Sequence, residues 1–298
     1  MRVRNFILVG LAAGLVTGAA AFADENSPPV ASGMTTTAPR CPAVKGDDPS
    51  SPKIIPNLFA AREELRLNHV QRAAAHLRPL AEDGNVEAQR ELGQLLLREG
   101  CNMPTDKKGA LSWLRKAAAK QDVPAQFLLG QALIYGKGGN VDEEDGAMWI
   151  KRAAKAGDAR AQTMLGYLYF AGRGVKTDKK EAIAWTVKAA EQGIAVALSN
   201  LAKSYMNGDG LPKDLHQAMI LISAAQQRIP PTQYQLISRL NETRYSIAHL
   251  LSVEEARAAE KEAEKWTPGP GSLAKVLTDS ANWKAGDSKP STEHDAGG

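Results

Sequence analysis

Apolar positions between residues 57 and 266 follow a helical spacing, and the pattern repeats every 36 residues. Trp113, Trp149 and Trp185 mark the same point of three successive periods, and Leu221 stands at that point in the fourth. Alanines follow this point in each period, and a Leu-Gly or Leu-Ala pair precedes it. Apolar residues three and four positions apart lie on one face of a helix, so each period predicts two helices joined by a turn.

Glycine and aspartate mark the ends of the two predicted helices. A G-x-G turn ends the first helix, because glycine adopts backbone angles that other residues avoid. An aspartate then caps the second helix. The glycine pairs are Gly136 and Gly138, Gly172 and Gly174, and Gly208 and Gly210, and the aspartates are Asp106, Asp142, Asp178 and Asp214.

No single helix pair can bury its apolar face alone, so the periods must stack on one another. The predicted fold class is all-α, an α-solenoid of stacked antiparallel helix pairs. Ser252 and Glu255 predict a capping box for the last helix of the stack. The expected order is a degenerate unit at 57–87, with His76 in the tryptophan position, then units at 88–124, 125–160, 161–196 and 197–230, and capping helices at 231–266.

Residues outside this region have the composition of targeting and linking segments. Residues 1–23 predict a cleaved signal peptide, because two arginines precede an apolar run that ends in a small-x-small cleavage site. An uncleaved anchor is the alternative, although the run barely reaches spanning length. Cleavage predicts a periplasmic or secreted bacterial protein without stable membrane insertion. Residues 24–56 predict a proline-rich linker, and residues 267–298 predict a disordered tail, with a short docking helix at 272–277 as the alternative.

Cys41 and Cys101 are the only cysteines of the chain. In an oxidising compartment an even number of cysteines permits a disulfide. Such a bond would join the linker to the unit at 88–124. Two free thiols are the alternative.

The third full unit carries a complete motif of small, apolar and turn residues. Its members are Ala161, Leu165, Gly166, Tyr169, Gly172, Gly174, Val175, Asp178, Ala182, Trp185, Lys188, Ala189, Ala190 and Gly193. This motif resembles the Sel1-like repeat family, a relative of the tetratricopeptide repeat. The resemblance implies a right-handed α-solenoid and a non-catalytic adaptor, and exported bacterial members are associated with envelope signalling, secretion or host contact. The other units match more loosely: Leu133 replaces the turn-facing tyrosine of the second, and the first lacks the G-x-G turn.

In tetratricopeptide-like stacks the first helix of each unit lines the concave face, and the resemblance implies the same arrangement here. The middle of the expected groove is then aromatic, with cations toward its ends, as in a protein-binding patch with a polar rim. The expected partner is a protein or peptide. The alternative is that Phe127 and Phe170 pack between helices as core. The candidate partner-binding residues are Arg90, Arg98, Phe127, Gln131, Tyr135, Arg160, Tyr167, Phe170 and Lys203.

Charge and motifs limit the other classes of function. A formal charge of +4 is too weakly basic for a dedicated nucleic-acid binder. The S-x-x-K strings at Ser50 and Ser272 lack the companion motifs of β-lactam-recognising enzymes, and His69 and His76 lack a third metal ligand. We therefore expect no enzyme, no cofactor and no metal. An envelope enzyme of β-lactam or peptidoglycan type and a purely structural envelope component are the alternatives.

Overall fold

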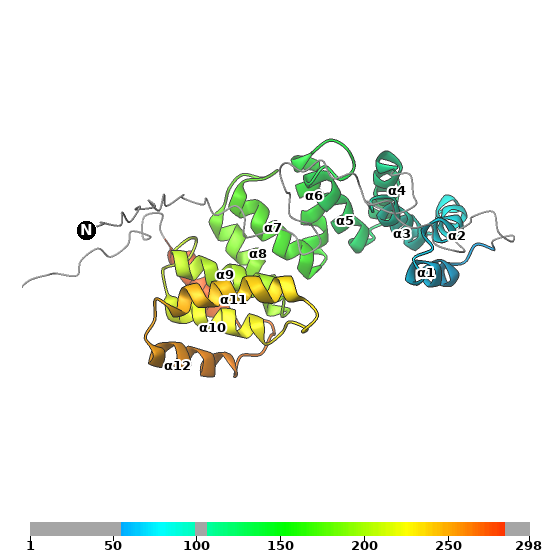
Figure 1. Ribbon diagram of the computed structural model, residues 1–298. Helices are drawn as coiled ribbons and strands as arrows, with labels where there is room; N and C mark the ends of the chain where they lie inside the picture. The colour runs from blue at the N-terminus through cyan, green and yellow to red at the C-terminus, as the bar shows by residue number, and fades with distance from the viewer. Residues whose placement is uncertain (1–54, 99–105, 284–298) are drawn as a thin grey trace, which may run out of the picture.

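The computed structural model describes residues 55–98 and 106–283. Within these ranges the chain forms α-helices and no strand, and consecutive helices pack against each other in a curved stack (Figure 1). The predicted all-α solenoid is confirmed. The helices are α1 (Leu58–Arg66), α2 (Val70–Glu82), α3 (Val86–Leu96), α4 (Lys107–Ala119), α5 (Val123–Ile134), α6 (Glu143–Lys155), α7 (Ala159–Ala171), α8 (Lys179–Glu191), α9 (Ala195–Asn207), α10 (Leu215–Gln226), α11 (Tyr234–Ala248), α12 (Val253–Ala263) and α13 (Ala274–Asn282).

The four full units are the pairs α3–α4, α5–α6, α7–α8 and α9–α10. Their first helices begin two residues before the predicted unit boundaries. The reason in the first three units is that Asn85, Asp122 and Asp158 accept a backbone N–H and cap these helices. The predicted caps of the second helices are confirmed: Asp106, Asp142, Asp178 and Asp214 each accept a backbone N–H at 2.8 to 3.0 Å.

Glycines shape both the turns and the helix crossings. Gly172 and Gly208 end α7 and α9 in the left-handed region, at φ values of 70° and 72°. Gly130, from the Leu-Gly pair of α5, lies where α6 crosses. A Cβ added there would lie 2.7 Å from the carbonyl oxygen of Gly146 and 2.8 Å from Cγ1 of Ile150. The repeated Leu-Gly pair is therefore a close-packing position between the helices of one unit.

A buried glutamine joins each of the first three full units to the helix before it. The side-chain amide donates to a backbone carbonyl near the end of the preceding helix, which satisfies two polar groups inside the stack. Leu198 takes this position in the fourth unit. The pairs are Gln89 with Ala81 (2.9 Å), Gln126 with Ala118 (3.3 Å) and Gln162 with Ala154 (3.2 Å).

A cation lies over each repeated tryptophan of the second helices. The pairs are Lys116 over Trp113 (3.9 Å to the ring centroid), Arg152 over Trp149 (4.5 Å) and Lys188 over Trp185 (4.0 Å). The fourth unit replaces both members, with Leu221 and Ala224. The three-residue spacing therefore reflects a physical pair on the helix surface.

The degenerate unit that the sequence predicts precedes the four full units. It consists of α1 and α2, and His76 fills the tryptophan position. The ring of His76 is 7% exposed, and its Nδ1 lies 3.0 Å from the carbonyl oxygen of Ile55. A satisfied core histidine therefore replaces the larger ring in this unit.

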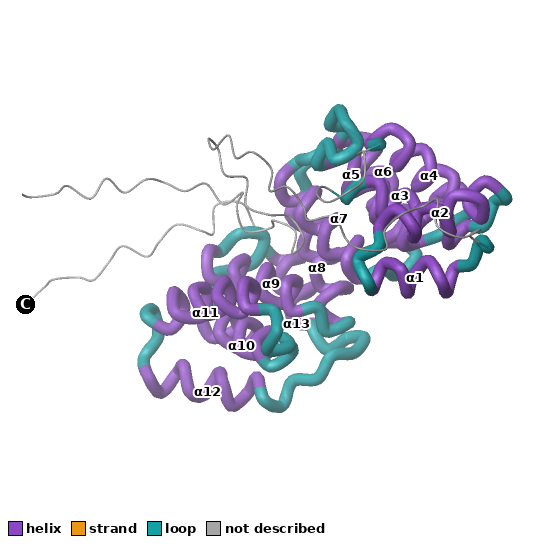
Figure 2. The backbone as a smooth tube through the Cα atoms, turned by 45° about the vertical axis from the view of Figure 1, so that its right-hand side comes forward, coloured by secondary structure: helices purple, strands orange, loops and turns teal. Residues whose placement is uncertain are grey.

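The C-terminal region differs from the predicted disordered tail and matches the alternative, a short docking helix, although the helix spans Ala274–Asn282 and not 272–277. The helix α11 packs on α10 and α9, and α12 packs on α10. Ser252 and Glu255 form the predicted capping box of α12. The chain then turns back, and α13 packs on α8 (Figure 2). Residues 267–283 are therefore ordered against the stack, because Leu273 and Val276 find an apolar surface there. The predicted signal peptide, the linker up to residue 54, both cysteines and residues 284–298 lie outside the described residues.

Candidate functional site

The candidate binding residues lie on the surface formed by α3, α5, α7 and α9, which we call the first-helix face. Phe127, Gln131 and Tyr167 are buried, with 8 to 9% exposure. The two aromatic rings of this group belong to one hydrophobic cluster, and Tyr135 packs against it. The position of Phe127 therefore matches the alternative in which it packs between helices. Tyr135, Phe170, Arg90 and Lys203 are half-buried, whereas Arg98 and Arg160 are exposed.

Phe127 of α5 is covered by a cation from the next unit. The guanidinium of Arg160 lies 4.6 Å from the ring centroid, a distance typical of a cation–π contact. Asp158 pairs with the same guanidinium at 2.8 Å. The side chain of Arg160 is nevertheless 57% exposed, so a binding partner can reach its charge.

Arg173 joins the second and third full units at this face. It is not among the candidate residues predicted from the sequence. It is the middle residue of a G-x-G turn, and it donates to Glu143 at 2.7 Å and to the carbonyl oxygen of Ile134 at 3.2 Å. Its guanidinium lies 5.6 Å from the ring of Tyr135. Burial opposes its charge, but hydrogen bonds to Glu143 and Tyr167 outweigh burial and raise its pKa. A cation between two turn glycines is the signal that would have found it.

The next joint repeats this arrangement with the charges exchanged. Asp209, the middle residue of the following G-x-G turn, pairs with Lys179 at the start of α8. Lys179 also lies 5.8 Å from the ring of Phe170 and 5.2 Å from that of Trp283. The G-x-G turns of the third and fourth full units therefore each form an ion pair with the second helix of the preceding unit.

Two of the predicted cations toward the ends of the face, Arg90 and Lys203, contact other groups within the stack. Arg90 pairs with Asp122, the cap of α5, at 2.6 Å. Lys203 lies where α11 packs on α9, and burial and the nearby charge of Arg239 lower its pKa, with Glu242 offsetting part of this effect. These two side chains are engaged within the stack. Accessible charge on the face therefore comes from Arg98 at one end and from Arg160 in the middle, between α5 and α7.

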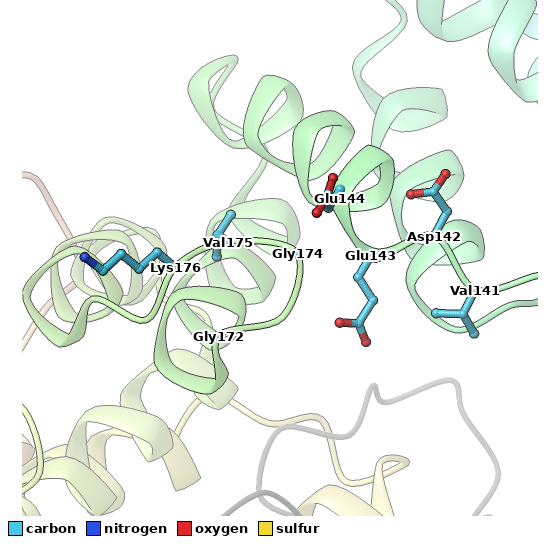
Figure 3. Close-up of a pocket in the computed structure, with 8 residues that line it drawn as sticks. All are labelled: Val141, Asp142, Glu143, Glu144, Gly172, Gly174, Val175 and Lys176. Carbon is cyan, nitrogen blue, oxygen red and sulfur yellow. The ribbon is translucent and has the colours of Figure 1, made fainter.

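An open cavity of about 520 Å³ lies between the turn before α6 and the turn after α7 (Figure 3). Its lining is polar and mostly acidic on the α6 side. The loop approaches so closely that a Cβ on Gly174 would lie 1.9 Å from the carbonyl oxygen of Glu143. The lining residues are Val141, Asp142, Glu143, Glu144, Gly172, Gly174, Val175 and Lys176. They contain no nucleophile with an adjacent base.

The described residues hold no group of three His, Cys, Asp or Glu side chains that could bind a metal. The Nδ1 atom of His69 lies 2.7 Å from Oε2 of Glu64, so this imidazole already has a hydrogen-bond partner within the degenerate unit. In the S-x-x-K string of the tail, Lys275 pairs with Asp279 at 2.8 Å, and the hydroxyl of Ser272 has no hydrogen-bond partner. This string therefore does not form a serine–lysine pair.

A solenoid of capped helix pairs with one repeated packing motif defines a helical-repeat protein of the tetratricopeptide-like class. The family model of the Sel1 repeat matches residues 86–122, 123–158, 159–194 and 195–225. Residues 86–225 of the chain therefore belong to the Sel1-repeat family. Sel1 repeats generally mediate protein–protein interactions, and the family is typically non-catalytic.

Two solved structures are similar to this chain. One is c5321, a protective antigen present in uropathogenic Escherichia coli strains, which displays an SLR fold; it is 26% identical, with a TM-score of 0.59. The match covers 75% of this chain and 48% of that chain, so this chain spans about half the length of that relative. The other, a Sel1 repeat protein from Oxalobacter formigenes, is 23% identical with a TM-score of 0.55 over 70% of this chain and 99% of that chain. It shows the fold alone.

No curated protein matches the chain by sequence. Among the described helices, none combines the length and the apolar character that a membrane crossing requires.

Proposed function

We propose that the protein is a non-catalytic adaptor that binds a protein or peptide segment in a concave groove on the first-helix face, between α5 and α7. One observation carries this proposal: three aromatic rings on or beside this face each lie within 6 Å of a cation. Arg160 covers Phe127, Arg173 approaches Tyr135, and Lys179 approaches Phe170. Such pairs offer apolar contact area together with donors for carboxylates or backbone carbonyls.

The stacked helices support a rigid mode of recognition. The glutamine bonds between units and the ion pairs Arg173–Glu143 and Lys179–Asp209 hold neighbouring units together. A surface that is ordered before binding loses little conformational entropy when a partner docks. Contacts made by the exposed Arg160 and the half-buried Tyr135 would then contribute directly to affinity.

A photoreactive amino acid in the full-length protein, expressed in its native cells, tests this site. We expect replacement of Tyr135 to give a covalent adduct with one discrete partner, and replacement of Met148 to give none. Met148 is a matched control, because its side chain is 41% exposed on α6, the second helix of the same unit. Adducts of equal yield at both positions, or an adduct at Tyr135 that persists unchanged with Arg160→Ala, would refute the groove.

We further propose that the protein acts in the periplasm or outside the cell after removal of residues 1–23. The arginines, apolar run and small-x-small site of this segment support export. N-terminal sequencing of the protein from fractionated cells tests the proposal, and Asp24 is the expected first residue. Retention of Met1 in a cytoplasmic fraction would contradict export.

A further inference from the structure

The outer face of the second helices changes character along the stack. Positions 36 residues apart should share an environment, yet one such position is occupied by Arg115, Lys151, Val187 and Ser223. The two cations are exposed or half-buried, whereas Val187 is 1% and Ser223 is 6% exposed. The outer face of α8 and α10 is therefore an apolar surface that is covered, in contrast to that of α4 and α6.

The helix α13 covers the part of this surface that lies on α8. The backbone N–H of Leu273 donates to Glu191 at the end of α8 (3.3 Å), and Lys180 at its start donates to the carbonyl oxygen of Ala281 (3.2 Å). The two helices therefore run antiparallel. Leu273 and Val276, three residues apart, are buried in the same hydrophobic cluster as Val187.

Two polar contacts set the position of α13 along this surface. Asp279, three residues after Val276, accepts a hydrogen bond from the hydroxyl of Tyr205 at 2.5 Å. The indole N–H of Trp283 donates to the carbonyl oxygen of Gly208 at 3.2 Å. The surface therefore binds three side chains on one face of a short helix, spaced three residues apart: two aliphatic side chains followed by a carboxylate.

The attachment of α13 has features of an exchangeable ligand. The helix has nine residues and no side-chain N-cap, so its helical form depends on docking. The hydroxyls of Ser272 and Ser280 are buried without a hydrogen-bond partner, which opposes docking. The loop before the helix contains Pro268, Gly269, Pro270 and Gly271, which are exposed or half-buried.

We propose that the outer surface of α8 is a second binding site, for a short amphipathic helix of another protein, and that α13 occupies it as an internal ligand. The partner helix carries two aliphatic residues three positions apart and an Asp or Glu three positions further on. A partner helix with the same pattern, but without unpaired buried hydroxyls such as those of Ser272 and Ser280, displaces α13. Tyr205 of α9 and Gly208 at the end of that helix complete this site, and Lys179 lies near both Trp283 of this site and Phe170 of the groove. The site does not include Tyr135 or Arg160, so the adduct at Tyr135 tests the groove separately.

A labelled peptide with the sequence of residues 272–283 tests the proposal against the full-length chain by fluorescence anisotropy. The Val276→Asp variant of the chain releases its own α13 and leaves the surface open. We expect this variant to bind the peptide at least about tenfold more tightly than the wild type, whose site is occupied. A peptide with Val276→Asp should not bind, and one with Asp279→Asn should bind more weakly.

Leu277→Asp is the matched control, because Leu277 is 43% exposed on the same helix whereas Val276 is 2% exposed, and we expect its substitution to leave the site occupied. Hydrogen exchange of residues 274–282 reports whether α13 is released in each variant, and Asp279→Asn provides a milder release if Val276→Asp unfolds the chain. Release of α13 without any gain in peptide affinity would overturn the proposal. A wild-type dimer that dissociates with Val276→Asp would also overturn it, since a second copy would then be the occupant.

Discussion

Single residues set how closely the helices of one unit approach each other. At Gly130 the helix α5 touches the backbone of α6, and no side chain fits between them. At Tyr205 a hydroxyl is held inside the stack by a carboxylate from the far end of the chain. Both positions depend on groups that are distant in sequence, and each supports a prediction at this scale.

The first prediction concerns Gly130→Ala. The new methyl group would lie 2.7 Å from the carbonyl oxygen of Gly146, so the two helices must separate. We expect the free energy of unfolding to fall by about 1 to 3 kcal/mol, as for other overpacked cores. Denaturant unfolding measures this change, with Gly269→Ala as the control because no atom lies near its added Cβ. An unchanged midpoint for Gly130→Ala would contradict the close crossing.

The second prediction concerns the pH range in which α13 stays docked. Burial, and the hydrogen bond to Asp279, raise the pKa of Tyr205 above its usual range. When α13 is released, Tyr205 ionises near its ordinary pKa of about 10, so docking contributes fully below about pH 10 and is lost as the pH rises further.

Near-ultraviolet titration checks this behaviour. At about pH 11 the wild type and Tyr205→Phe should show the same tyrosinate signal, because Tyr205 is still protonated in the folded chain. A larger signal in the wild type at this pH would show that Tyr205 ionises normally. The titration of Asp279→Asn should shift toward lower pH, because the hydrogen bond that favours the protonated form is weakened.

Successive helices are joined by elements that recur with the repeat, and the G-x-G turn is the clearest of them. In two of the three G-x-G turns the middle residue forms an ion pair with the start of the second helix in the preceding unit, as Arg173–Glu143 at one joint and Lys179–Asp209 at the next. The reversed charges indicate that the pairing, and not one particular residue, is what this position requires.

The third prediction tests this joint with a charge exchange. Asp209→Lys should lower the free energy of unfolding by about 0.2 to 1 kcal/mol, the range of partly exposed ion pairs. Adding Lys179→Asp should restore most of the loss, and 1 M salt should reduce the effect of the single substitution. A double-mutant cycle measures the coupling, and strictly additive effects would indicate that the pair does not join the units.

Across the described part of the molecule, each helix from α1 to α11 packs mainly on its neighbours in the chain, as expected of a solenoid. The two ends of the described stack differ. The helix α1 packs on α2 and leaves Phe59 73% exposed, whereas the C-terminal end is bound back onto the stack by α12 and α13. Local stability should therefore be lowest at the N-terminal end of the described stack.

Native-state hydrogen exchange gives the fourth prediction. We expect amides of α1 to exchange fastest among the first helices, and those of α5, α7 and α9 to be the most protected, because each of these packs between two neighbours. With Val276→Asp, protection should fall in α13 and at the exposed face of α8 while α3 to α6 stay unchanged. Uniform protection along the stack would contradict a repeat protein with local openings.

The 36-residue period, the caps and the Leu-Gly positions could be read from the sequence, because they depend on neighbours within one or two units. The sequence by itself therefore determined the class of fold and the position of nearly every helix. Only the tertiary structure decided which aromatic residues stay accessible, since Phe127 and Tyr167 are buried by packing between α5 and α7. It also decided that residues 274–282 form a helix, because the surface that orders them, on α8 and Tyr205, lies about 70 to 100 residues earlier in the chain. The sequence offered a short docking helix at 272–277 only as the alternative to a disordered tail, because a short helix without a cap has little local stability and the contacts that stabilise it exist only in the folded stack.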